Sequence, residues 1–433
     1  MRPSSSLPVL HGLGLSTFAL LVACSSDAVS GGTSGAGNSG AGNSGAGDGP
    51  SASGASSGAG SSAGGTTGSA GAGQAGRANN AGAAGAIPRG GGPAIDYGNP
   101  DVPPSEWTNM TGTFAGLQSE CGNMSGIFPS PFIDLLVLGV ARQGLWSSTD
   151  GAATYRKLGE SGDDFLSRLT TVTWDPSSSQ VFYVSGIYGW ESPFTDGVFK
   201  TANAGASLSG YKKLSAIQSH NDSISVDFSD PDRKTLLSGG HEQAETLFRS
   251  TDAGENWTNI GPSLPADVGF CTTALVIDSQ HLLVGCAASY SGKAGAVLRS
   301  SDGGATWAKA GPQGAVNQPL WATDGSIYWA AEAGGLLKSS DQGATFVQVS
   351  DKPSNRVAPI ELPDGRIASV VDKAVALSND GGKTWETIGA AIPFEPNSIG
   401  YSPFRRAFFA THFDCTNAVP ADAIARYGFD FKR

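Results

Sequence analysis

Polar and apolar positions divide the chain into three stretches of different character. Residues 13–22 are largely apolar, residues 31–90 contain no aromatic residue, and from about residue 105 short runs of alternating apolar and polar positions recur to the C-terminus. Alternation with a period of two is typical of β-strands that bury one face. Seven of these runs end in a turn dipeptide, at Ser130-Pro131, Asp175-Pro176, Asp230-Pro231, Asp278-Ser279, Asp324-Gly325, Asp364-Gly365 and Ser402-Pro403. The pattern predicts an all-β domain built from repeated units.

A second motif recurs within the same stretch, with the order Ser, any residue, Asp, any residue, Gly, any residue, Thr, aromatic. The best copies span residues 300–307 and 378–385, close variants begin at Ser250 and Ser339, and looser ones begin at Ser148 and Thr201. The acidic position, once an Asn, is occupied by Asp150, Asn203, Asp252, Asp302, Asp341 and Asp380. Asp accepts backbone N–H bonds in a tight turn and Gly supplies a positive φ, so the motif predicts a hairpin turn. The aromatic residue suits the space between neighbouring sheets.

This motif resembles the Asp-box, also called the bacterial neuraminidase repeat, and the resemblance covers residues 105–433. In that family the box lies on the hairpin between the third and the outer strand of a β-propeller blade. The resemblance implies that the boxes are structural and that ligands bind at the opposite end of the ring.

The two repeats differ in number, since there are seven turns but six boxes. The last repeat has inner strands around residues 399–411 and a third strand at 423–427, but it has no box. Residues 106–110 match residues 256–260, the strand that follows a box. We therefore expect a seven-bladed β-propeller over residues 101–433, closed by an N-terminal strand in the last blade. Six blades with a stray terminal hairpin remain the alternative.

The N-terminal apolar run is too short to span a bilayer and is typical of a signal peptide over residues 1–23. The sequence Leu21-Val22-Ala23-Cys24 resembles the lipobox of bacterial lipoproteins, which implies lipidation at Cys24; an ordinary secretory signal with a chance Cys is the alternative. Gly, Ala and Ser make up 46 of the 60 residues of 31–90, so residues 24–100 are expected to form a disordered, flexible tether. The expected location is the bacterial cell envelope, lipid-anchored at the outer membrane or cell surface.

Charge and cysteine content narrow the choice further. The chain carries 27 Lys and Arg against 38 Asp and Glu, a net charge of −11, which argues against a nucleic-acid partner. The sequence implies no cofactor and no metal. Besides Cys24 there are four Cys residues, and the repeat register suggests the disulfides Cys271–Cys286 and Cys121–Cys415; free buried thiols remain the alternative.

Polar and aromatic residues that could bind a ligand fall in loops at the end opposite the boxes. The segments around His220, Asp222, His241 and Glu242 flank an antiparallel strand pair, so they should be neighbours that could act in acid–base chemistry. Tyr188 and Trp190 could stack on a sugar or hold a peptide. The remaining candidates in these loops are Arg142, Asp163, Asp164, Glu191, Tyr290, Glu332, Asp372, His412 and Asp414.

Two functions follow from these features. The first is a non-catalytic, monomeric lipoprotein propeller that binds an envelope protein or glycan, because the chain also resembles the propellers of photosystem assembly factors and sortilin-type receptors. The alternative is a carbohydrate-active enzyme, an exo-sialidase-like glycoside hydrolase or a polysaccharide lyase. Sialidases carry an Arg triad and a Phe-Arg-Ile-Pro motif ahead of the first box, whereas residues 126–132 here contain no Arg. Xyloglucan-cutting glucanases use two propellers around a cleft, which one propeller cannot supply.

Overall fold

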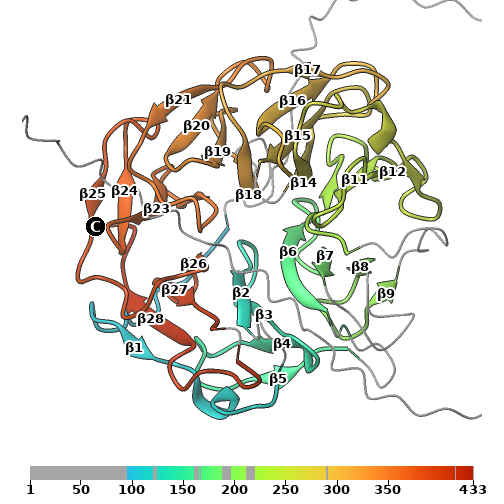
Figure 1. Cartoon of the computed structure of the whole chain (residues 1–433). Coiled ribbons are helices and arrows are strands. Elements are labelled where there is room, and N and C mark those ends of the chain that lie inside the picture. Colours follow the sequence, from blue (N-terminus) through green and yellow to red (C-terminus); the bar gives the residue numbers. More distant parts are fainter. Residues whose placement is uncertain are drawn as a thin grey trace, which may run out of the picture. The chain divides into compact units, whose positions relative to one another are not determined.

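The computed structural model describes residues 95–119, 124–159, 165, 167–187, 197–210, 220–288, 291–414 and 416–432. All of these residues belong to one compact unit. Within them the chain forms seven four-stranded antiparallel sheets arranged around a central axis (Figure 1). The expected seven-bladed β-propeller is confirmed. The described residues contain no helix that is long and apolar enough to cross a membrane. The expected signal peptide, Cys24 and most of the expected tether lie outside these residues.

Six blades are each formed by four consecutive strands, of which the first lies nearest the axis and the fourth is outermost. Blade 1 has β2 (Met124–Pro129), β3 (Leu136–Val140), β4 (Gly144–Ser148) and β5 (Arg156–Lys157). Blade 2 has β6 (Arg168–Trp174), β7 (Phe182–Ile187), β8 (Gly197–Thr201) and β9 (Ser209–Gly210). Blade 3 has β10 (Ser225–Val226), β11 (Leu236–Gly239), β12 (Leu247–Ser250) and β13 (Thr258–Asn259). Blade 4 has β14 (Phe270–Val276), β15 (Leu282–Ala287), β16 (Ala296–Ser300) and β17 (Ala308–Lys309).

The C-terminal blades repeat this order. Blade 5 has β18 (Ala315–Trp321), β19 (Ile327–Ala331), β20 (Leu336–Ser339) and β21 (Val347–Ser350). Blade 6 has β22 (Ile360–Glu361), β23 (Ile367–Val371), β24 (Ala374–Ser378) and β25 (Glu386–Thr387). Blade 7 has β26 (Ser398–Ser402), β27 (Ala407–Thr411), β28 (Ile424–Gly428) and, as its outer strand, β1 (Thr108–Asn109). Two 3₁₀ turns, Gly112–Phe114 and Gly261–Ser263, are the helical elements of the described residues.

Ring closure follows the prediction from the sequence, because the N-terminal strand completes the last blade. β1 pairs antiparallel with β28, with Thr108 opposite Arg426 and Asn109 opposite Ala425. The half-buried Trp107 extends this contact: its ring centroid lies 5.3 Å from that of Tyr427, and its indole N–H donates to Ala390 O of blade 6 at 3.0 Å. The closing strand therefore holds blade 7 to blade 6 as well as completing its sheet.

The residues ahead of β1 form a strap along blade 7. Tyr97 makes edge-on contacts with Phe404 and Phe431, at centroid distances of 5.1 and 5.8 Å. The Arg406 guanidinium donates to Asn99 Oδ1 at 3.0 Å and pairs with Asp430 at 3.2 Å. Phe404 and Arg406 belong to the turn between β26 and β27, so the strap lies at the same end of the ring as the box hairpins.

The box hairpins share one hydrogen-bond pattern, which the 300–307 copy illustrates. Asp302 Oδ1 accepts the Thr306 N–H at 2.9 Å and the Ser300 hydroxyl at 2.8 Å, while Oδ2 accepts the Thr306 hydroxyl at 2.6 Å. Gly303 and Gly304 have φ values of +70° and +90°, which an L side chain rarely adopts. The hydrogen bonds from Thr306 and Ser300 lower the pKa of Asp302 to about 2. Equivalent bonds hold Asp150, Asp252, Asp341 and Asp380.

Trp107→Ala tests the closing strand. We expect the free energy of unfolding to fall by about 2 kcal/mol, because a half-buried Trp loses less than the 3–5 kcal/mol of a fully buried one. Val347→Ala is the control: its side chain is 59% exposed, so a change within about 0.5 kcal/mol is expected. Equal denaturation midpoints for the two variants would show that Trp107 does not secure the ring.

Replacement of Gly334 or Gly335 by Ala tests the tight turn between β19 and β20. Their φ values are +93° and +94°, so Ala at either position costs about 1 kcal/mol in backbone strain. A Cβ at Gly335 would lie 2.3 Å from the backbone oxygen of Ser350, whereas one at Gly334 has no atom within 4 Å. We expect Gly335→Ala to lower thermal stability further, by about 1–3 kcal/mol, than Gly334→Ala.

Candidate functional site

The strand order divides the loops of the ring between two ends. Turns between the first and second strands and between the third and fourth strands, which include the boxes, lie at one end. Turns between the second and third strands and the connections from blade to blade lie at the other end, which we call the candidate face. The segments 220–222 and 241–242 meet on this face, because an isolated bridge between Asn221 and Gly240 extends the pairing of β10 with β11.

A histidine–aspartate pair forms the centre of this cluster. His241 Nδ1 lies 2.8 Å from Asp222 Oδ2, and His241 Nε2 lies 3.9 Å from Glu242 Oε1. The rings of His220 and His241 are edge-on, with centroids 6.4 Å apart. The side chains of His241 and Asp222 are 17% and 15% exposed, so the pair is largely shielded from water. All four residues predicted to converge from blade 3 lie together.

The protonation of His241 follows from these contacts. Burial disfavours the charged imidazolium, but attraction to Asp222, its hydrogen bond and the nearby Glu242 outweigh burial, so the pKa of His241 stands above its usual value. Arg168 opposes this rise in pKa. The contribution of the pair to stability is therefore complete below about pH 6.5 and is lost as the pH rises through the folded-state pKa.

Hydrogen bonds that involve three blades fix the position of the pair. The Asp222 N–H donates to Gly239 O at 3.0 Å, and the His241 N–H donates to His220 O at 2.9 Å. The Thr171 hydroxyl of β6 donates to Asp222 O at 3.1 Å, and the Ser223 hydroxyl donates to Thr272 O of β14 at 2.8 Å. The pair is thus held by blades 2 and 4 as well as by its own blade.

Arg168 is a site residue that the sequence analysis missed. It begins β6, affects His241 electrostatically, and places its guanidinium carbon 5.7 Å from the ring centroid of Phe413, in the loop after β27. It therefore connects the neighbourhood of His241 to blade 7. Two signals were available in the sequence. One is a charged residue at the start of an inner strand, and the other is an aromatic residue between His412 and Asp414.

The other predicted residues of the candidate face belong to blades 1, 5, 6 and 7. Arg142 and Asp372 are exposed on the β3–β4 and β23–β24 turns, both with positive φ. His412 stacks on Phe394, with centroids 4.3 Å apart, and its Nε2 lies 3.2 Å from Asp422. Glu332 accepts the Ala288 N–H at 2.6 Å, and Asp414 accepts the Thr416 N–H and hydroxyl. The candidates outside the described residues are Asp163, Asp164, Tyr188, Trp190, Glu191 and Tyr290.

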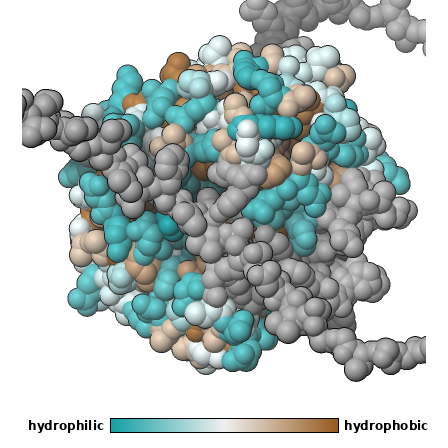
Figure 2. All heavy atoms as spheres, viewed as in Figure 1, coloured by the Kyte–Doolittle hydropathy of each residue, from teal (hydrophilic) through white to brown (hydrophobic). Residues whose placement is uncertain are grey.

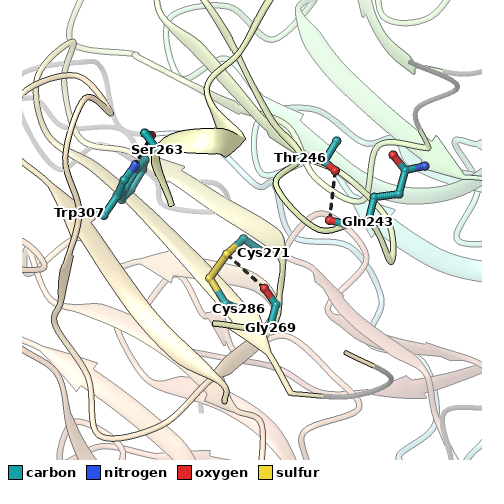
Figure 3. Close-up of a disulfide and its surroundings, with 7 residues drawn as sticks. All are labelled: Gln243, Thr246, Ser263, Gly269, Cys271, Cys286 and Trp307. Atoms are coloured by element: carbon teal, nitrogen blue, oxygen red, sulfur yellow. Dashed lines mark hydrogen bonds between the residues drawn. A yellow bond between two sulfur atoms is a disulfide. The ribbon is translucent and has the colours of Figure 1, made fainter. Parts of the chain in front are cut away.

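A disulfide joins Cys271 of β14 to Cys286 of β15, the pairing that the repeat register suggested (Figure 3). The two residues lie directly opposite each other in the strand register, near the candidate face. Cys121 and Cys415 are outside the described residues. Among the residues that the structure describes, no three His, Cys, Asp or Glu side chains gather as a metal site.

Asp222→Asn tests the origin of the His241 pKa. Burial remains in this variant while the attraction to Asp222 is lost, so we expect the pKa of His241 to fall below its usual value near 6.5. Titration of the imidazole carbon-bound proton by NMR measures the change. Glu242→Gln is the matched control, and it should lower the pKa less because Glu242 is 3.9 Å away rather than 2.8 Å. An equal fall in both variants would contradict the assignment.

No family model matches the chain, and no curated protein matches it. Similar solved structures include the glycoside hydrolase GH74 xyloglucanase from Xanthomonas campestris (17% identity, TM-score 0.47, 76% of this chain and 56% of that chain). Another is YCF48 bound to a D1 peptide (16%, 0.48, 79% and 99%). A third is the extracellular domain of a putative hybrid two-component system from B. thetaiotaomicron (15%, 0.52, 75% and 42%). The chain spans 56% and 52% of the length of the GH74 enzymes from X. campestris and Niastella koreensis. At these identities the likeness shows the β-propeller fold alone.

Proposed function

We propose that this chain is a surface-tethered lipoprotein propeller that binds a protein or glycan on the candidate face without catalysis. The observation that carries this proposal is that side chains of different blades meet near both ends of β6, in one case across the axial channel. An exo-acting hydrolase on a single propeller needs an axial pocket that encloses its substrate, since enclosed pockets bury most of a small ligand. Crossing side chains favour a shallower surface.

The first contact lies at the candidate face, where Arg168 reaches past blade 1 to Phe413 of blade 7. The second lies toward the box end, where Gln318 of blade 5 donates to the Thr173 hydroxyl of blade 2 at 3.1 Å. Arg168 and Thr173 are five residues apart on one strand, which corresponds to about 16 Å along the channel. The inner strands around this channel are visible in Figure 1.

Surface chemistry supports a polar ligand. Val347 is the exposed large apolar side chain among the described residues, and it lies on an outer strand rather than on the candidate face. In the view of Figure 2, apolar residues are scattered among hydrophilic ones. A surface of this kind suits a glycan or a charged protein patch better than an apolar partner, which requires a contiguous apolar area.

The second function is the carbohydrate-active enzyme, and one observation favours it. His241 faces Asp222 through one ring nitrogen and Glu242 through the other, and its raised pKa suits a general acid near neutral pH. A His–carboxylate pair can also be a recognition element, since it presents a cation and an anion side by side. Because a side chain crosses the channel, we favour recognition over catalysis.

Anchoring is the part of the proposal that rests on the sequence. Lipidation at Cys24 and the Gly, Ala and Ser-rich segment after it would attach a monomeric propeller to the outer membrane or cell surface of the bacterial envelope. Its partners would be the membrane, through the lipid, and an envelope protein or glycan. No cofactor is required for this role.

A glycan array and a chromogenic glycoside panel test the function with the full chain. We expect binding without turnover, and Arg168→Ala should weaken that binding about tenfold, because it removes a cation that acts on His241 and contacts Phe413. Lys383→Ala removes an exposed cation at the box end and is the charge-matched control. Robust hydrolysis that disappears in Asp222→Ala or Glu242→Ala would replace this proposal with the enzymatic one.

A further inference from the structure

We propose that the Cys271–Cys286 disulfide is a positioning element for the Asp222–His241 pair. It fixes the bulged end of β14, and the Thr272 carbonyl at that bulge holds the part of blade 3 that carries the pair. The inference rests on the proposed role of the candidate face. Its test observes the pair itself, so it can fail or succeed whether or not a ligand is found.

The disulfide stands beside an irregularity in the sheet. Cys271 lies opposite Cys286, but the register then shifts between Cys271 and Thr273, which leaves Thr272 as the extra residue of a bulge. Both cysteines are buried, at 2% and 0% exposed. A bulge interrupts the ladder of hydrogen bonds and allows local movement. A covalent bond at the next residue limits that movement.

The bulged residue contacts blade 3 directly. Thr272 O accepts the Ser223 hydroxyl at 2.8 Å, and Ser223 Oγ in turn accepts the Gly239 N–H at 3.3 Å. A Cβ at Gly239 would lie only 2.3 Å from Thr272 O, so the two blades meet backbone to backbone at this point. Figure 3 shows the surroundings of the disulfide, which include the turn from Gln243 to Thr246. This turn follows His241 along the chain.

Ser223 and Gly239 carry the pair on the adjoining residues. Asp222 precedes Ser223, His241 follows Gly239 by two residues, and the Asp222 N–H donates to Gly239 O. A shift of the Thr272 carbonyl therefore moves both sides of the 2.8 Å contact between His241 and Asp222. The other groups that face His241 are Glu242, the Arg168 guanidinium and the His220 ring.

Loosening the pair lowers the pKa of His241 by either of two routes. If the Asp222 contact lengthens while the site stays buried, the imidazolium loses its attraction and keeps the penalty of burial. If the loop opens to water, the pKa returns toward its usual value, which lies below the present one.

The experiment compares three variants of the full chain by NMR titration of His241, whose signal is assigned with His241→Gln. The variants are Cys271→Ala with Cys286→Ala, Ser223→Ala, and the combination of all three. We expect the first two to lower the pKa of His241 and the triple variant to lower it no further than the larger of the two, because they interrupt one path. Amide exchange at Asp222 and His241 should quicken in the same variants.

Trp107→Ala is the control for general destabilisation, because it weakens the ring at the seam of blade 7 and leaves blades 3 and 4 intact. It should leave the pKa of His241 unchanged. The proposal is overturned if loss of the disulfide, verified by intact mass, leaves this pKa and the amide exchange unaltered. It is equally overturned if Trp107→Ala lowers the pKa as much as loss of the disulfide. Ser223→Ala keeps the disulfide and tests the path even if the cysteine variants fold poorly.

Discussion

A ring of sheets is closed by the strand that joins the two ends of the chain, because each blade packs mainly on its two neighbours. Here that strand is β1, which pairs with β28 inside the last sheet over two residues. Trp107 and the strap around Tyr97 and Arg406 enlarge it with aromatic contacts and a buried ion pair. The contact between Arg168 and Phe413 joins blade 2 to blade 7, so it depends on this closure. The position of Phe413 against Arg168 therefore depends on the closure, whereas contacts from blades 2, 3 and 4 hold the Asp222–His241 pair.

The inner strands contribute a second set of contacts, between each blade and the next. Along one edge, the backbone of each inner strand bonds to the second strand of its own blade. Along the other edge, side chains of adjoining blades bond to part of the backbone. The Ser125 hydroxyl donates to Leu169 O, the Thr173 hydroxyl to Ile224 O, and the Asn317 amide to Asn355 O. Ser223 donates to Thr272 O in the same manner. These polar contacts explain why Ser, Thr and Asn occupy strands that are otherwise apolar.

Much of this architecture could be predicted because its signals are local. The Asp302 box specifies its own turn, and the likeness of residues 106–110 to 256–260 indicated the closing strand. His220 and His241 could be brought together because they flank one strand pair. Arg168 could not be recognised, since its importance arises from His241 and Phe413, which come from two other blades. The candidates Arg142 and His412 share the face but belong to separate blades. Their positions in the sequence contain no information on distances around the ring, so their separation could not be predicted.

The strap makes the two ends of the ring different. At Tyr97 the chain lies against the turn between β26 and β27, on the side of the boxes, and the Arg406 guanidinium donates to Gly98 O there. The described chain therefore begins at the end of the ring that carries the boxes, opposite His241. In the proposed role, the tether and the ligand would therefore occupy opposite poles, and a load carried through the tether would reach the strap before it reached the candidate face.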